Sequence, residues 1–174
     1  MRNRIYILAA CFISFIFTAC QNEDNDIKLP TGELFVVKTT DISKAPVDKI
    51  DMIFSVEDIK SFNTSTGEII FKNLTAKEIE KRINGYDSSL TYFIGDMKLF
   101  NSVFIVPEWS SAVYNDLSLV IVDSKCYIFN GYPSLDIIEY KKEEYRQLRE
   151  ENIQKNKKSW DIFIKYLGNK GIAN

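Results

Sequence analysis

The sequence predicts an α+β domain, built from an antiparallel sheet of about five to seven strands, two short helices and one long C-terminal helix. Three observations predict this class. Runs rich in β-branched and aromatic residues recur between residues 33 and 129, and turn-forming residues separate them. Capping signals precede two short stretches among those runs. A long stretch, from about residue 136 to residue 167, is rich in Glu, Lys, Gln and Arg and lacks glycine and proline.

The apolar runs place the strands. We expect strands at residues 33–39, 68–72, 90–94, 97–100, 117–122 and 126–129. Gly95-Asp96 suits a type II′ hairpin turn, and Asp123, Ser124 and Lys125 mark a second hairpin. A further run over residues 102–106 either continues the strand before it or starts a new one. The two runs of the second hairpin are almost continuously apolar, which predicts central strands covered on both faces.

Capping patterns place the helices. Ser55 and Asp58 have the spacing of a capping box, so a short helical turn is predicted over residues 56–62. Thr75 and Glu78 form a second box, ahead of a short helix that ends at Asn84-Gly85. The long helix has its apolar residues roughly on one stripe, which predicts packing on the sheet; partial projection is the alternative. The stripe residues are Tyr145, Leu148, Ile153, Trp160, Phe163, Ile164 and Leu167.

The N-terminus has the pattern of a bacterial lipoprotein signal. Arg2 and Arg4 precede a mostly apolar run over residues 5–17, and small residues stand before Cys20. A leader of this kind is removed, and the sulfur of the first remaining residue, Cys20, is acylated. A membrane-spanning helix would need about 20 apolar residues, and the polar residues after Cys20 end the run short of that. We therefore predict a leader over residues 1–19 and a lipid anchor in the bacterial outer membrane.

A polar tether is expected to follow the anchor. Residues 20–32 show no apolar periodicity, so they should form a flexible link to a single domain over residues 33–174. Glu23, Asp24 and Asp26 resemble the acidic export signal of Bacteroidetes surface lipoproteins, which implies display on the cell surface. An ordinary solvated linker facing the periplasm is the alternative.

Charge and cysteine usage limit the function. The chain has 22 Lys and Arg against 24 Asp and Glu, and loss of Arg2 and Arg4 with the leader leaves a net charge of −4. This balance does not indicate nucleic-acid binding, which calls for a basic surface. With Cys11 removed and Cys20 acylated, Cys126 has no partner for an intrachain disulfide, so we expect a buried thiol in a strand.

The complete absence of histidine argues against most catalytic chemistry. It excludes Ser-His-Asp and Cys-His arrangements in their usual forms and removes the commonest ligand of zinc and iron sites. The sequence also lacks glycine-rich phosphate loops and the calcium loop pattern. We therefore expect no metal, no cofactor and a protein that is not an enzyme.

The best candidate site combines two loops. Residues 107–116 gather aromatic, hydroxyl and carboxylate side chains, and residues 131–134 should emerge at the same end of the second hairpin. Such groups suit sugar or peptide recognition; the alternative is that the aromatic side chains close one end of the core. The candidate ligand-binding residues are Glu108, Trp109, Tyr114, Asp116 and Tyr132. A carboxylate-dependent hydrolase is a further alternative, with Glu108 and Asp116 as its pair.

Four blocks of the chain resemble a group of small Bacteroidetes lipoproteins without an assigned activity. They are residues 58–63, 67–72, 114–117 and 131–133, and the resemblance spans most of the chain after the leader. It implies an outer-membrane or surface lipoprotein and brings no catalytic residues. The expected function is a non-catalytic interaction domain that holds another envelope protein. A small glycan- or peptide-binding module using Trp109, Tyr114 and Asp116 is the alternative.

Overall fold

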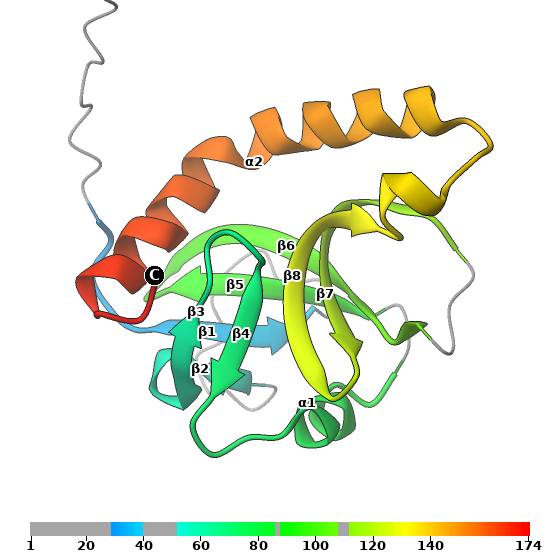
Figure 1. Cartoon of the computed structure of the whole chain (residues 1–174). Helices are drawn as coiled ribbons and strands as arrows, with labels where there is room; N and C mark the ends of the chain where they lie inside the picture. Colours follow the sequence, from blue (N-terminus) through cyan, green and yellow to red (C-terminus); the bar gives the residue numbers. More distant parts are fainter. Residues whose placement is uncertain (1–28, 40–51, 86–87, 108–111) are drawn as a thin grey trace, which may run out of the picture.

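The computed structural model describes residues 29–39, 52–85, 88–107 and 112–174. An eight-stranded sheet curves around the core, and a long helix lies across one end of it (Figure 1). The strands are β1 (Leu34–Lys38), β2 (Met52–Ser55), β3 (Ile59–Phe62), β4 (Glu68–Phe71), β5 (Ser89–Ile94), β6 (Met97–Ile105), β7 (Tyr114–Val122) and β8 (Lys125–Tyr132). The helices are α1 (Ala76–Ile83) and α2 (Lys142–Asn169), with short 3-10 turns η1 (Val56–Asp58) and η3 (Leu135–Ile137).

The sheet curls because its two edge strands are neighbours in the sequence. The strand order is β2-β1-β5-β6-β7-β8-β4-β3, which puts β2 and β3 at opposite edges. In a flat sheet those edges would lie about 34 Å apart, at roughly 4.8 Å per strand spacing. The link through η1 spans at most about 14 Å, so the edges must come together. Ile172 and Asn174 then continue past α2 and hydrogen-bond to the backbone of Phe62 on β3.

The predicted α+β class is confirmed, but the predicted strand count and pairing are not. The sheet has eight strands, and the two that were missed are β2 and β3, with four residues each. The capping box at Ser55 and Asp58 is present, yet it caps the 3-10 turn η1 and not a helix through residue 62. A four-residue strand beside a capping signal carries too little periodicity to be recognised.

The prediction of a purely antiparallel sheet was also wrong. β6 and β7 pair in parallel, with Phe104 opposite Leu119, while the other pairings are antiparallel. Both predicted hairpins are present, β5 with β6 and β7 with β8. The apolar run over residues 102–106 continues β6 to Ile105 past an irregularity in register. Parallel pairing joins two hairpins that are distant in sequence, so local turn signals do not reveal it.

Local signals locate α1 well. Thr75 accepts a hydrogen bond from the backbone of Glu78, and the Glu78 carboxylate accepts one from the backbone of Thr75 at 2.7 Å. Asn84 ends the helix in the left-handed conformation, as its position predicted. Ile79 and Ile83 are fully buried, so the helix packs its apolar face on the core.

The long helix begins later than predicted. Its expected bounds were about residues 136–167, whereas α2 spans Lys142–Asn169. Ser134 caps the separate turn η3, and Lys141 takes a positive φ of 56° that interrupts any continuous helix. Helix propensity over residues 136–141 was therefore outweighed by the local capping and turn conformation.

The core is rich in aromatic residues and joins the sheet to the end of α2. Tyr92 and Phe100 pack with ring centroids 4.6 Å apart, and Phe163 of α2 contacts both of them. Phe62 of β3 and Trp160 of α2 extend the same cluster. Cys126 is buried and free, as predicted, and burial raises the pKa of its thiol to about 12.

The two halves of α2 are held differently. The C-terminal half buries Ile162, Phe163, Tyr166 and Leu167. In the stretch from Lys142 to Asp161, Arg149 is the one buried residue. The helix therefore packs where its apolar stripe is dense. Its N-terminal half passes over β7 and β8 (Figure 1), and the residues of α2 that pack on the described hydrophobic core begin at Trp160.

Candidate binding groove beneath the C-terminal helix

Two of the predicted binding residues lie opposite each other at one end of the β7–β8 hairpin. Tyr114 is the first residue of β7 and pairs with Tyr132, the last residue of β8. Both side chains are partly buried. The two loops singled out by their composition therefore do start from one place in the fold.

Asp116 lies apart from these tyrosines. It is exposed and lines a hollow on the β6 side of α2, together with Asn101 and Lys155. Tyr132 lines a different cavity, on the β8 side of the helix. The structure thus does not bring Asp116 and Tyr132 into one cavity.

The remaining predicted residues, Glu108, Trp109 and Cys20, lie outside the described residues. Ligand binding by Trp109, the separation of the Glu108 and Asp116 carboxyls and lipidation of Cys20 all stay predictions.

Arg149 organises this end of the fold, and the sequence reasoning missed it. Its side chain is 5% exposed. Nη2 donates to the carbonyl oxygen of Pro133 at 2.8 Å and to that of Tyr114 at 3.2 Å, and Nε donates to Oδ1 of Asn115 at 3.4 Å. One guanidinium thus ties α2 to the start of β7 and to the segment after β8.

Gly131 makes room for this guanidinium. Its φ is +88°, and a Cβ at this position would lie 2.3 Å from Nε of Arg149 and 2.6 Å from Cζ. Both the backbone conformation and the close approach therefore require glycine. A glycine near the end of an otherwise apolar strand, β8, is the one sequence signal that could have indicated this packing.

Two amide side chains complete the attachment of the helix. Asn152 Nδ2 donates to the carbonyl oxygen of Asn115 at 2.9 Å, and Asn130 Nδ2 donates to the carbonyl oxygen of Arg149 at 3.1 Å. These polar contacts hold the N-terminal half of α2 at a distance from β8. They fix the helix without filling the space beneath it.

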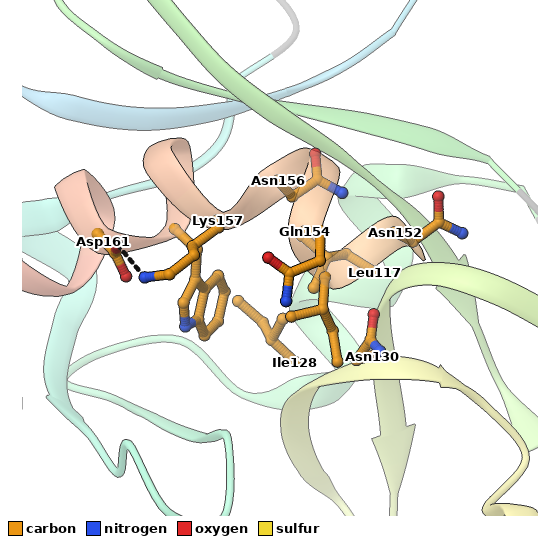
Figure 2. Close-up of a pocket in the computed structure, with 10 residues that line it drawn as sticks. Leu117, Ile128, Asn130, Asn152, Gln154, Asn156, Lys157 and Asp161 are labelled. Atoms are coloured by element: carbon orange, nitrogen blue, oxygen red, sulfur yellow. Dashed lines mark hydrogen bonds and ion pairs between the residues drawn. The ribbon is translucent and has the colours of Figure 1, made fainter. Parts of the chain in front are cut away.

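That space consists of two adjoining cavities, which we call the groove. The first, of about 390 Å³, lies between β7, β8 and the middle of α2 (Figure 2). The second, of about 710 Å³, lies between the end of β8, the region around η3 and the start of α2. Both are lined by Asn130 and Ile153, so they follow one another along the helix.

The first cavity combines an apolar floor with amides. Figure 2 shows Leu117 and Ile128 beneath the helix, and the ion pair of Lys157 with Asp161, at 2.9 Å, at one end. Trp160 adds an aromatic wall. The amides are Asn130, Asn152, Gln154 and Asn156. Such a lining offers apolar contact together with both hydrogen-bond donors and acceptors.

Asn130 stands where the two cavities meet, and its Oδ1 has no hydrogen-bond partner. It is the buried side-chain oxygen or nitrogen that stays unsatisfied in the described part of the chain. A buried acceptor without a donor costs about 1–3 kcal/mol. A ligand that donates an N–H or O–H group here would remove that cost.

The second cavity carries an unneutralised positive charge. The three acceptors of Arg149 are neutral, and the ion pairs among the described residues do not include it. Burial lowers the pKa of its guanidinium, the direction expected for a cation taken out of water without an anionic partner. Arg146 lines the same cavity and pairs with Glu143 on the helix surface, and the carboxylate of Glu150 lines it as well.

No family model, curated protein or solved structure matches the chain. The resemblance to Bacteroidetes lipoproteins therefore stays a prediction. Within the described ranges, His, Cys, Asp and Glu nowhere gather in a group of three that could hold a metal ion. Neither described helix is long and apolar enough to cross a membrane.

Proposed function

We propose that the protein is a non-catalytic binding domain of the bacterial envelope. In this proposal a lipid on Cys20 holds it at the outer membrane, and the groove beneath α2 binds a segment of another envelope protein. The lipoprotein pattern around Cys20 supports the location. The groove supports the activity.

One observation carries the proposed activity: the N-terminal half of α2 spans the sheet over open space. A long helix in a folded domain is normally stabilised by packing an apolar face, yet from Lys142 to Ser159 the one residue that this helix buries is the charged Arg149, and its packing on the core begins at Trp160. Ile153, which lines both cavities, is 47% exposed. This half of the helix therefore covers the two cavities of the groove and does not cover the hydrophobic core.

The dimensions suit an extended ligand. The lining residues on α2 run from Arg146 to Asp161, which corresponds to about 22 Å of helix at 1.5 Å per residue. An extended peptide of roughly six or seven residues has that length.

Glycan binding in the same groove is the second candidate. Four amide side chains and Trp160 line the first cavity, and aromatic faces with amides are also what sugar recognition uses. The module predicted from the sequence, which uses Trp109, Tyr114 and Asp116, stays a prediction because Trp109 lies outside the described residues; of the wider set of predicted binding residues, Asp116 and Tyr132 line separate cavities.

Site-specific photo-crosslinking in intact cells tests the proposal. A photoreactive residue in place of Ile153 should form a crosslink to a discrete partner. The matched control is the same residue in place of Lys77, which is exposed and lines a hollow beside α1, at the opposite end of the domain (Figure 1). No crosslink at position 153, or the same products from both positions, would show that the groove is not a binding site.

A further inference from the structure

The second cavity lies between β8 and α2 and reaches the edge of β8. Its lining includes the consecutive residues Phe129, Asn130, Gly131 and Tyr132. Successive side chains of a strand point to opposite faces of the sheet. A cavity that touches both Phe129 and Asn130, whose side chains point to opposite faces, therefore reaches around the edge of the strand.

The pairing of β8 confirms that its edge opens at this point. β4 pairs with β8 at Cys126 and Tyr127, and the N–H of Ile128 then donates to the carbonyl oxygen of Gly67 at 2.9 Å. Backbone groups of alternate residues point the same way along a strand, so the N–H and C=O of Asn130 face the same side as those of Ile128. The named pairings on that side stop before Asn130.

The charged groups that line the cavity are the guanidiniums of Arg149 and Arg146 and the carboxylate of Glu150, and the unpaired Arg149 indicates what kind of ligand would fit. The hydrogen bonds of Arg149 use Nε and Nη2, so the two N–H groups of Nη1 have no acceptor within the described ranges. Arg146 lies on the same wall, three residues away on the helix. A guanidinium that is neutralised by no carboxylate favours a ligand that brings one.

We propose that the groove binds an extended peptide that adds as a strand to β8 at Asn130 and places a carboxylate on Arg149 and Arg146. This deepens the proposed function and rests on it. The peptide backbone would bond with the free N–H and C=O of Asn130, and a further peptide N–H would satisfy its Oδ1. Strand addition supplies affinity through the main chain, and the flanking cavities select side chains.

An extended peptide explains more of the site than an acidic sugar does. A sugar carboxylate would account for the charge of Arg149 but has no alternating N–H and C=O groups to match an open strand edge. The neighbouring Phe129, Leu135 and Ile153 give apolar walls to the same cavity, as a peptide side chain beside the carboxylate would need.

The proposal is tested with the full chain purified in detergent and arrays of random-sequence heptapeptides. One array carries free C-terminal and side-chain carboxylates, a second carries the same sequences with an amidated C-terminus and with Asn and Gln in place of Asp and Glu, and a third carries acidic and neutral oligosaccharides. The best peptides are then remade with alternate backbone nitrogens methylated. These changes are on the ligand, so they leave the fold of the protein intact.

We expect the free-carboxylate peptides to bind about 10- to 100-fold more tightly than their amides, since a hydrogen bond to a charged group contributes about 1.5–3 kcal/mol. Methylation of a peptide nitrogen that bonds to β8 should weaken binding about 2- to 10-fold, since a neutral hydrogen bond contributes about 0.5–1.5 kcal/mol. Arg146→Gln should weaken carboxylate binding several-fold, whereas Lys77→Gln should not. Equal binding of acids and amides, tolerance of methylation at every position, or binding of oligosaccharides alone would overturn the proposal. A crosslink at position 153 without peptide binding would show that the groove binds a partner but not by addition of a strand to β8, so this proposal would fail and the proposed function would stand.

Discussion

Replacing Arg149 by Met should release the N-terminal half of α2 and leave the rest of the fold in place. Methionine keeps much of the apolar stem and removes the guanidinium. The hydrogen bonds to Pro133 and Tyr114, at 2.8 and 3.2 Å, are lost. Each bond from a charged donor contributes about 1.5–3 kcal/mol, and part of that loss is offset because the buried cation is removed too. A net cost of about 2–3 kcal/mol follows.

This cost is local, because the two halves of the helix are anchored by different contacts. Phe163 and Leu167 are buried in the core, and the Tyr166 hydroxyl accepts from the backbone of Leu34 at 3.2 Å. None of these contacts depends on Arg149. At about 1.4 kcal/mol per tenfold change, the opening equilibrium of the N-terminal half should rise about 30- to 150-fold.

Amide hydrogen exchange on the full chain in detergent measures this opening by segment. Residues 143–158 of the Arg149→Met variant should exchange about 30- to 150-fold faster, while residues 162–167 keep their protection. Arg146→Met is the matched control, since it removes the same charge from an exposed surface ion pair, whose worth is at most about 1 kcal/mol. Equal loss of protection in both segments, or no change in the first, would refute Arg149 as the anchor of this half of the helix.

Four further predictions follow from single residues. Gly131→Ala should lower the urea midpoint by an amount equivalent to about 2 kcal/mol or more, because its Cβ would meet a buried guanidinium at a positive φ; an unchanged midpoint would contradict this. Cys126, whose thiol pKa is raised to about 12, should resist iodoacetamide at neutral pH until the chain is unfolded, as read by peptide mass spectrometry; native labelling would contradict it. The pKa of Glu78 is lowered by hydrogen bonds from the backbone and then the side chain of Thr75. Its ionised form therefore stabilises the folded state at neutral pH, and this stabilisation is lost as the pH falls below the ordinary pKa of a glutamate. Glu78→Gln should therefore flatten the acid limb of stability against pH, and an unchanged limb would argue against the cap. Cys20→Ser should move the chain from the membrane fraction to the soluble fraction, and membrane retention would exclude lipid anchoring at that residue.

Local patterns predicted those parts of the fold that local interactions determine. The capping box of Thr75 and the end of α1 at Asn84 were placed correctly because the chemistry lies within one helical turn. The Gly95-Asp96 turn predicted the β5–β6 hairpin for the same reason. The parallel pairing of β6 with β7 could not be read in this way, because it joins strands through a crossover whose geometry depends on the whole sheet.

The site was predictable to the same limited extent. The predicted β7–β8 hairpin correctly placed Tyr114 and Tyr132 at the same end of the fold. Arg149 stands in a polar helical stretch and differs from Arg146 in no sequence property, so its burial depends on where the docked helix meets the carbonyls at the ends of β7 and β8. The groove results from that docking of the helix, and no sequence pattern predicts it.

Mapping of a bound peptide by backbone amide chemical shifts tests the central claim most directly. The free-carboxylate heptapeptide selected from the array is added to the isotopically labelled full chain in detergent. The account predicts shift changes confined to residues 128–132 of β8 and to residues 146–161 of α2, which line the groove. Changes centred on the hollow beside Lys77 and Glu80 of α1, with none along β8, would contradict it.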